Sequence, residues 1–319
     1  DREKAGLSLD WRLSKSFGLF ANFSREDKEG NRVGTAGNFT TALQMPEPID
    51  SATSTYEFGF NWTGQAAHAR LAYYVQKYDN QVNGVSWDNP FTTFSATAGR
   101  MATSPDNEAK QLVLSAGVRL ALDTSLGFSA VMGSVSQDAA LLPYTITAGL
   151  SPGALPRASL NGDISVNHYA LTMSSRPFDK IRVRGAMRFD DRNDDTPAIT
   201  FANGYVESDM GRMLASVTPQ RYSYKRRQGE LEGEYEVLDG IKLFVGMRGE
   251  DLKRTNQDVD KTTEGTGYSG LRILPAAGVS LTMRIGETHR DAADARTPES
   301  WENANFWKYN QANRDRDFL

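Results

Sequence analysis

One short segment of the chain, GELEGEYEV at residues 229–237, carries a carboxylate at every second position. The acidic residues are Glu230, Glu232, Glu234 and Glu236. Two carboxylates can act as general acid and general base when their surroundings push their pKa values apart. Carboxylates that are evenly spaced along one strand lack that asymmetry. We therefore interpret this row as structural and expect no catalytic role for it.

The residue types that other reactions need are absent or isolated. There is no cysteine, which excludes disulfides, thiolate metal sites, cysteine catalysis and haem attached through a Cys-x-x-Cys-His motif of this chain. The three histidines, His68, His168 and His289, lie far apart in the sequence. No Gly-x-Ser-x-Gly elbow and no Walker loop occurs. The sequence therefore predicts a protein that is not an enzyme and that binds no metal or cofactor directly.

The dominant period of the chain is two residues, as expected of β-strands with one apolar and one polar face. Leu7, Leu9, Trp11 and Leu13 show it first, and later segments repeat it. Paired strands are predicted at 6–13 and 18–26, 54–62 and 67–78, 110–122 and 126–136, 163–173 and 181–190, 222–237 and 241–252, and 268–274 and 279–287. Short connections lie within pairs. Long polar connections lie between pairs, and we assign the acidic run DDRNDD at 190–195 to a solvated loop tip. Binding of a hard cation such as Ca²⁺ by its carboxylates is the alternative.

The alternation of short and long connections distinguishes two β architectures. A soluble sandwich has strands of about five or six residues, whereas a transmembrane barrel has strands of about 10 residues, tight periplasmic turns and long outer loops. The fold class predicted here is therefore all-β: a transmembrane antiparallel up-and-down β-barrel with about twelve strands. We treat residues 1–319 as one barrel region in contact with a lipid bilayer. A net charge of only −4 gives no indication of nucleic acid as a partner.

The polar faces of three predicted strands carry complementary charges. Arg182, Arg184 and Arg188 lie on 181–190, and Lys242 and Arg248 lie on 241–252. Because consecutive strands of such a barrel are antiparallel neighbours, the glutamate row is predicted between two basic rows. Cross-strand pairs of opposite charge contribute roughly 0.2–1 kcal/mol each. We predict a luminal ladder of salt bridges that stiffens the wall, and the alternative is that some members also contact an occupant of the lumen.

Three stretches combine strand segments with charged or proline-containing ends: LDWRLSKSFGLFANFSREDKEG, PEPIDSATSTYEFGFNW and RYSYKRRQGELEGEYEVLDGIKLFVGMRGEDLKRT. They resemble segments of the MtrB/PioB family of outer-membrane barrels. The last segment, WKYNQANRDRDFL, is similar to the family's Tyr-x-x-Ala-x-Arg-Asp-Arg motif through Tyr309, Ala312, Arg314, Asp315 and Arg316. The resemblance implies part of a larger barrel, with the N-terminal signal segment and the remaining strands outside this sequence.

The resemblance also implies a function. Barrels of this family enclose a periplasmic multihaem cytochrome in the outer membrane and dock it to an extracellular one, so that electrons cross through haems supplied by the partner cytochromes. The barrel itself carries no redox group. A general or substrate-specific porin, or a receptor barrel with its own plug, remains an alternative with the same alternation. A soluble β-rich carbohydrate-binding protein or enzyme is a further alternative.

Overall fold

The computed structural model describes residues 1–38, 41–89, 97–149, 153–202, 216–276, 278–293 and 311–319. Thirteen strands form one sheet: β1 (Arg2–Arg12), β2 (Phe17–Asn38), β3 (Thr41–Thr63), β4 (Ala67–Asn80), β7 (Asn107–Leu120), β8 (Thr124–Gln137), β9 (Gly162–Phe178), β10 (Ile181–Asp194), β11 (Tyr224–Leu238), β12 (Ile241–Arg254), β13 (Lys261–Ala276), β14 (Val279–Ala292) and β15 (Arg314–Phe318). A separate pair consists of β5 (Gly84–Asp88) and β6 (Ala98–Ala102). None of the described residues forms a helix long and apolar enough to cross a membrane.

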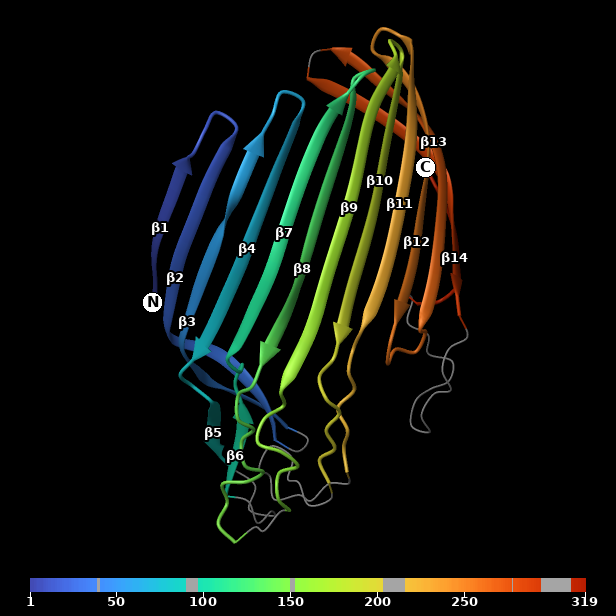
Figure 1. Cartoon of the computed structure of the whole chain (residues 1–319). Helices are drawn as coiled ribbons and strands as arrows, with labels where there is room; N and C mark the ends of the chain where they lie inside the picture. The colour runs from blue at the N-terminus through green and yellow to red at the C-terminus, as the bar shows by residue number, and fades with distance from the viewer. Residues whose placement is uncertain (39–40, 90–96, 150–152, 203–215, 277, 294–310) are drawn as a thin grey trace.

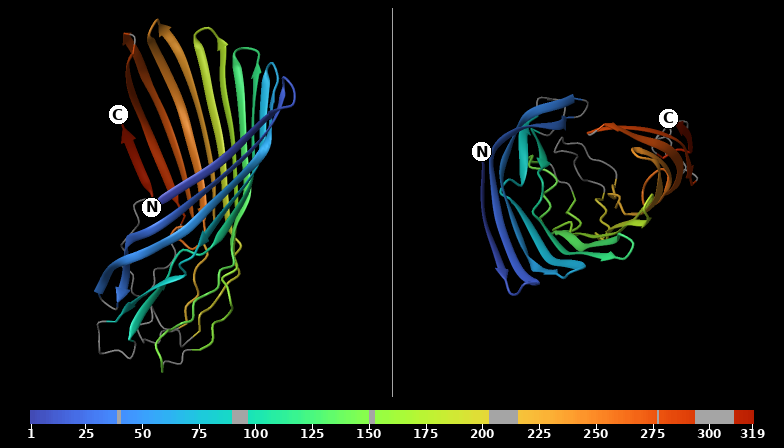
Figure 2. Two further views of the ribbon diagram at one scale, coloured as in Figure 1. Left: turned by 90° about the vertical axis from the view of Figure 1, so that its left-hand side faces the viewer. Right: turned by 90° about the horizontal axis from the view of Figure 1, so that it is seen from above.

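The thirteen strands follow one another in chain order, and each is antiparallel to its neighbours; β7 pairs with β4 because β5 and β6 stand apart. The sheet is curved (Figures 1 and 2), and we call the space on its concave side the hollow. This arrangement confirms the predicted barrel class. Within the described residues the sheet is an open wall, with β1 and β15 at its two edges. Tight turns join the strands at one end. The turn after β11 is an example, because Gly240 has a φ of 77° there and a β-bulge adjoins it.

Several predicted connections are wrong, because they contain strand; β13, for example, begins at Lys261 within the predicted connection 253–267. Residues 27–53 are predicted as a polar connection, but β2 and β3 continue as a paired ladder to Asn38 and Thr41. The ladder there is supported by polar contacts such as the ion pair between Arg32 Nη2 and Glu47 Oε1 at 2.5 Å, which apolar alternation does not reveal. This part of β3 is an edge, since β4 pairs only with its second half, and an edge tolerates the two prolines at 46 and 48.

Two further differences concern DDRNDD, which is predicted as a loop tip, and the C-terminal segment, for which no strand is predicted. DDRNDD belongs to β10 as far as Asp194, because its carboxylates have cross-strand partners such as Lys225, whose Nζ lies 3.1 Å from Asp191 Oδ2. The tail after Asn313 forms β15 on the edge of β14. The pair β5 and β6 also lies within a predicted loop.

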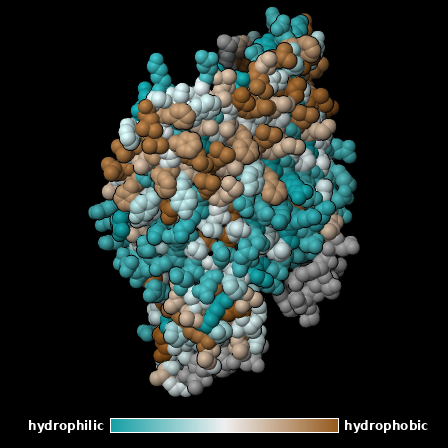
Figure 3. Space-filling model, viewed as in Figure 1, coloured by the Kyte–Doolittle hydropathy of each residue, from teal (hydrophilic) through white to brown (hydrophobic). Residues whose placement is uncertain are grey.

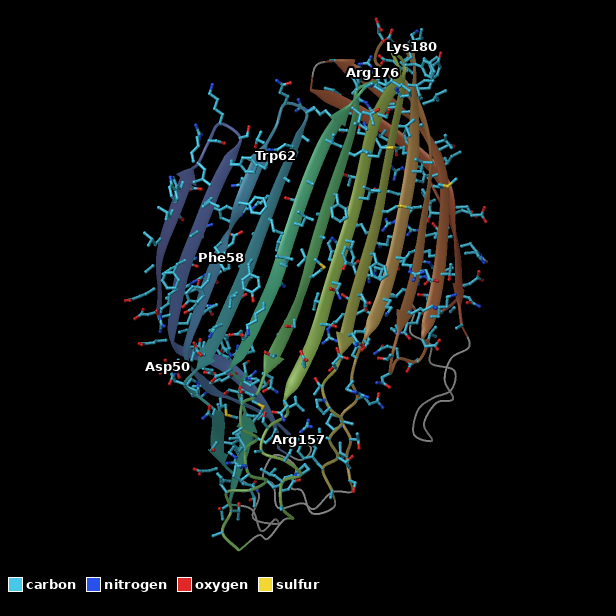
Figure 4. All side chains as sticks on the ribbon, in the orientation of Figure 1. Asp50, Phe58, Trp62, Arg157, Arg176 and Lys180 are labelled. Carbon is cyan, nitrogen blue, oxygen red and sulfur yellow. The ribbon has the colours of Figure 1, made fainter. Side chains whose placement is uncertain are left out.

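The described parts of the long connections gather at the end of the wall opposite the tight turns. Figure 4 marks the two ends, with Arg176 and Lys180 beside the turn from β9 to β10 and Arg157 among the long connections. These connections contact one another: Arg157 Nη2 donates to the carbonyl oxygen of Pro197 at 3.0 Å, and the rings of Tyr144 and Phe201 lie 6.2 Å apart. Short turns are periplasmic and long loops extracellular in bacterial barrels. The long connections therefore form the extracellular mouth.

The two faces of the sheet differ in polarity. On one face large apolar side chains are exposed, among them Leu9 at 62%, Phe58 at 56% and Val245 at 64%. Figure 3 shows this face over the strands turned toward the viewer, with apolar residues toward the turn end and polar residues toward the long connections. Exposed apolar side chains of alternating strand positions are the lipid-facing surface of a barrel. We call their zone the apolar belt.

Glycines show which face is concave. Side chains on the concave face of a curved sheet converge, and those on the convex face diverge. A Cβ added at Gly246 or Gly270, on the charged face, would overlap the ring of Tyr268 or that of Phe244. A Cβ added at Gly233 or Gly267, on the apolar face, would meet nothing within 4 Å. The charged face is therefore the inner face that lines the hollow, and the apolar face is the outer one.

Candidate functional site

The inner face of β10, β11 and β12 carries the charged rows that the sequence predicts. The glutamate row lies between the arginine row and the lysine row, in the order β10, β11, β12. The register places Arg182 opposite Glu234 and Arg184 opposite Glu232. On the other side it places Lys242 opposite Glu236 and Arg248 opposite Glu230.

Only part of this array is joined by ion pairs. Arg184 Nη1 lies 3.5 Å from Glu232 Oε1, and Lys242 Nζ lies 3.4 Å from Glu234 Oε1. Lys242 therefore pairs with Glu234, which lies one inner-face position from the residue directly opposite it. In the described part of the chain, no ion pair includes the remaining members, which are Arg182, Arg188, Glu230, Glu236 and Arg248.

The partners of two glutamates come from β13, which sequence reasoning missed. Arg272 Nη1 lies 2.5 Å from Glu234 Oε2, so that Glu234, only 5% exposed, is held by two cations. Tyr268 donates its hydroxyl to Glu232 Oε2 at 3.0 Å. Both contacts pass over β12, and Tyr268 crosses at Gly246, which has no side chain to obstruct the ring. The sequence feature that could have indicated this contact is Gly246 on the inner face, directly opposite Tyr268.

Aromatic rings and guanidinium groups pack together beside this cluster. Phe244 is 3% exposed, and the guanidinium carbons of Arg272 and Arg284 lie 5.5 Å and 5.6 Å from its ring centroid. Arg284 also lies 4.5 Å from the centroid of Tyr268. Cation–π contacts of this kind contribute about 0.5–2 kcal/mol depending on desolvation. The inner wall from β11 to β14 is therefore braced, and its paired charges have fixed positions.

Three charged residues remain open to the hollow. Arg188, Glu230 and Arg248 are exposed on the inner face and line one small depression in the wall. Their neighbours Glu232 and Glu234 are occupied by partners on the wall, whereas these three groups are available to whatever lies in the hollow. The ladder thus contains members that pair on the wall, such as Glu232 and Glu234, and three exposed members that take part in no ion pair among the described residues.

A second charged cluster lies on the inner face near the β1 edge. Glu57 accepts hydrogen bonds from Asn22 Nδ2 at 2.9 Å and from Arg70 Nη2 at 2.6 Å. The guanidinium of Arg70 lies 4.2 Å from the ring centroid of Phe20. The sequence signal was Glu57, an isolated acid between Tyr56 and Phe58 in an alternating strand. The wall is therefore braced at two places around the hollow.

The family-like C-terminal motif lies partly in β15. Tyr309 lies outside the described residues, and Ala312 precedes the strand. Arg314 Nη2 lies 3.0 Å from Glu264 Oε2 on the inner face, next to Arg290 Nη2 at 2.6 Å from the same oxygen. Arg316 is opposite Thr288, and Asp315 points to the outer face, where it contacts His289. The motif therefore attaches β15 to β14 through charged contacts.

His289 makes the attachment of β15 dependent on pH. It lies on β14 beyond the apolar belt, and hydrogen bonds with Asp315 and with Asp291, together with their charges, raise its pKa. Because the pKa of His289 is raised in the folded protein, protonated His289 stabilises the contact fully at pH values below the ordinary pKa of histidine. This stabilisation is lost as the pH rises through the raised pKa. We expect the hydrogen-exchange protection factors of β15 to fall as pH rises through that window in the wild type and to be insensitive to pH in His289→Asn. Equal pH dependence in both proteins would contradict the assignment.

The fold and the polarity of its two faces identify the class of protein. An antiparallel sheet that curves around a hollow, with an apolar outer belt, a charged inner face, tight turns at one end and long connections at the other, is a bacterial outer-membrane β-barrel. Such a protein resides in the outer membrane.

The chain belongs to the MtrB/PioB family, whose model, described as "Putative outer membrane beta-barrel porin, MtrB/PioB", matches residues 1–319. Outer membrane protein MtrB of Shewanella baltica (strain OS185) is 26% identical over 320 residues, which cover 99% of this chain and 45% of that protein. The chain thus spans less than half the length of this relative. The ferric-catecholate import receptor Fiu of E. coli K12, in its closed form, matches with a TM-score of 0.53 at 13% identity, over 91% of this chain and 51% of that one. That likeness shows the fold alone.

Proposed function

We propose that this chain forms part of a sleeve in the outer membrane that holds a multihaem c-type cytochrome. Electrons cross the membrane through the haems of that partner, and the barrel performs no chemistry of its own. The haem belongs to the partner because this chain has no cysteine to attach one. The cytochrome extends from the periplasm, and an extracellular cytochrome docks at the mouth formed by the long connections.

The width of the wall carries this proposal. Within the described residues, thirteen adjacent strands follow one another, and β1 and β15 at the two edges do not pair with each other. Barrel diameter grows with strand number, and barrels with about 16–18 strands leave an aqueous channel while those with about 22 hold a plug. A barrel in this range of strand numbers lets water and ions through its lumen unless a protein domain fills it.

The inner face suits a protein occupant. Arg188, Glu230 and Arg248 present both signs of charge to the hollow, and the braced glutamates beside them keep the surface in place. Complementary charges across an interface mainly provide specificity and register. We therefore assign these three residues to contact with the cytochrome and the paired residues to the wall.

The proposal is tested on the full-length protein purified from its native outer membrane. We expect a haem-staining partner to co-purify with the barrel and the complex to carry electrons from a reduced dye inside vesicles to an acceptor outside. Charge reversal at both exposed arginines, Arg188→Glu with Arg248→Glu, is expected to lower the retained haem several-fold. Arg25→Glu, the same reversal on the outer face of β2, should leave it unchanged.

Two results would contradict the proposal. The first is a barrel that emerges without a haem-staining partner and conducts ions through an open pore in a planar bilayer, which is the behaviour of a porin. The second is equal haem retention in the inner-face and outer-face variants.

A further inference from the structure

Three lysines lie side by side on the outer face at the extracellular end of the wall. Lys225, Lys253 and Lys261 are direct cross-strand neighbours on β11, β12 and β13. All three are exposed, and the side chains of Lys225 and Lys261 are 60% and 47% exposed. They share a face with Leu231 and Val245 of the apolar belt. We call them the lysine row.

The lysine row is only partly neutralised. Like charges directly opposite each other on a sheet repel. Lys225 Nζ lies 3.1 Å from Asp191 Oδ2, and Lys261 Nζ lies 3.5 Å from Asp251 Oδ2. In the described part of the chain, no ion pair includes Lys253, the central member. The row therefore has an excess of positive charge.

Neighbouring groups do not remove that excess. Arg227 adds a further cation one outer-face position toward the belt, with its guanidinium 5.8 Å from the ring centroid of Phe189. The next carboxylate along the outer face, Asp291, lies opposite Thr263 and is 3.0 Å from His289 Nε2. The local charge around Lys253 thus favours an anionic ligand.

A bare stretch of backbone separates the lysine row from the belt. Gly229, Gly249 and Gly265 are cross-strand neighbours on the same outer face, two positions along each strand from Arg227, Asp251 and Thr263. A Cβ added at Gly229 or Gly265 would meet nothing within 4 Å, and one at Gly249 would meet only the carbonyl oxygen of Glu264 at 3.9 Å. Met187 and Met247, 65% and 64% exposed, border this flat area on the side of the belt.

We propose that the lysine row binds the phosphate of an anionic glycolipid in the outer leaflet, whose sugar and first methylene groups lie on the three glycines. The occupant follows from position and charge together. The site faces away from the hollow, begins where the apolar belt ends, and lies on the extracellular side, where lipid headgroups meet a barrel. A phosphate fits there because lysine ammonium groups bind phosphate as point charges.

The test uses the full-length protein in detergent and diphosphorylated lipid A as the probe, followed by native mass spectrometry or microscale thermophoresis. We expect Lys253→Gln with Lys261→Gln to weaken lipid A binding at least fivefold. The matched control is Lys77→Gln with Lys110→Gln, because these outer-face lysines on β4 and β7 share one carboxylate, that of Glu108. The control pair should bind as the wild type does.

A second variant separates charge from shape. Gly249→Leu keeps every lysine but fills the bare area, and it is expected to weaken lipid A binding while heat-modifiability shows a folded barrel. Removing the phosphates from lipid A should have the same effect as removing the lysines, and inorganic phosphate should not compete at millimolar concentration. The proposal is overturned if dephosphorylated lipid A binds equally well, or if the Lys253 and Lys261 variants bind no worse than the control pair.

Discussion

Replacement of Glu234 by glutamine is expected to destabilise the barrel by about 2–3 kcal/mol. Glu234 is 5% exposed and lies between Lys242 and Arg272, whose side chains are 19% and 24% exposed. Removing one member of a buried ion pair leaves the remaining charges desolvated without compensation, which costs about 3–5 kcal/mol in a dry interior. Partial hydration of the two cations lowers the expected loss. Glutamine has nearly the same shape as glutamate, so the substitution removes the negative charge and leaves the packing unchanged.

The control for this prediction is Glu230→Gln on the same strand and the same face. Glu230 is exposed and belongs to no ion pair in the described residues, so its replacement should change the free energy of unfolding by less than about 0.5 kcal/mol. Both variants of the full-length protein are unfolded by urea in lipid vesicles, with tryptophan fluorescence as the signal. Adding Arg272→Gln to Glu234→Gln should cost less than the sum of the single changes. Equal losses for Glu230→Gln and Glu234→Gln would contradict the central position of Glu234.

The alternating pattern predicts the strands with apolar outer faces, but it does not reach beyond the belt. Beyond the belt, toward the long connections, β2 and β3 continue as a ladder without a continuous apolar face, and the pair Arg32 with Glu47 supports it on the inner face. Such a ladder has the same composition as a loop, so alternation alone predicts a connection there. β15 is not predicted because its five residues are too few to show an alternating pattern. Its position also depends on the free edge of β14, which the sequence alone does not reveal.

The sequence predicts the three charged rows of the site, but it does not predict which side chains contact one another. The order of β10, β11 and β12 follows from chain order, so the glutamate row between basic rows could be expected. The contacts of Glu232 with Tyr268 and of Glu234 with Arg272 cross an intervening strand. They depend on the stagger of three strands and on the curvature that brings inner side chains together. Neither quantity can be obtained from the spacing of residues in one strand.

Curvature has a direct consequence for two glycines of β13 that lie three residues apart on opposite faces. Gly270→Val is expected to destabilise the barrel by about 3 kcal/mol or more. A Cβ at Gly270 would overlap the carbonyl oxygen of Met283 and the ring of Phe244. Backbone cannot move aside as a flexible side chain can, and Phe244 is held between the guanidinium groups of Arg272 and Arg284.

Gly267→Val is the matched change on the outer face. A Cβ there would meet nothing within 4 Å, and valine is favoured in strands, so the free energy of unfolding should stay within about 0.5 kcal/mol of the wild type. The measurement is again urea unfolding of the full-length protein in lipid vesicles. If Gly267→Val proved to be the damaging change and Gly270→Val the tolerated one, the sheet would curve in the opposite sense. The charged face would then be convex, and Arg188, Glu230 and Arg248 would face away from any occupant of the barrel.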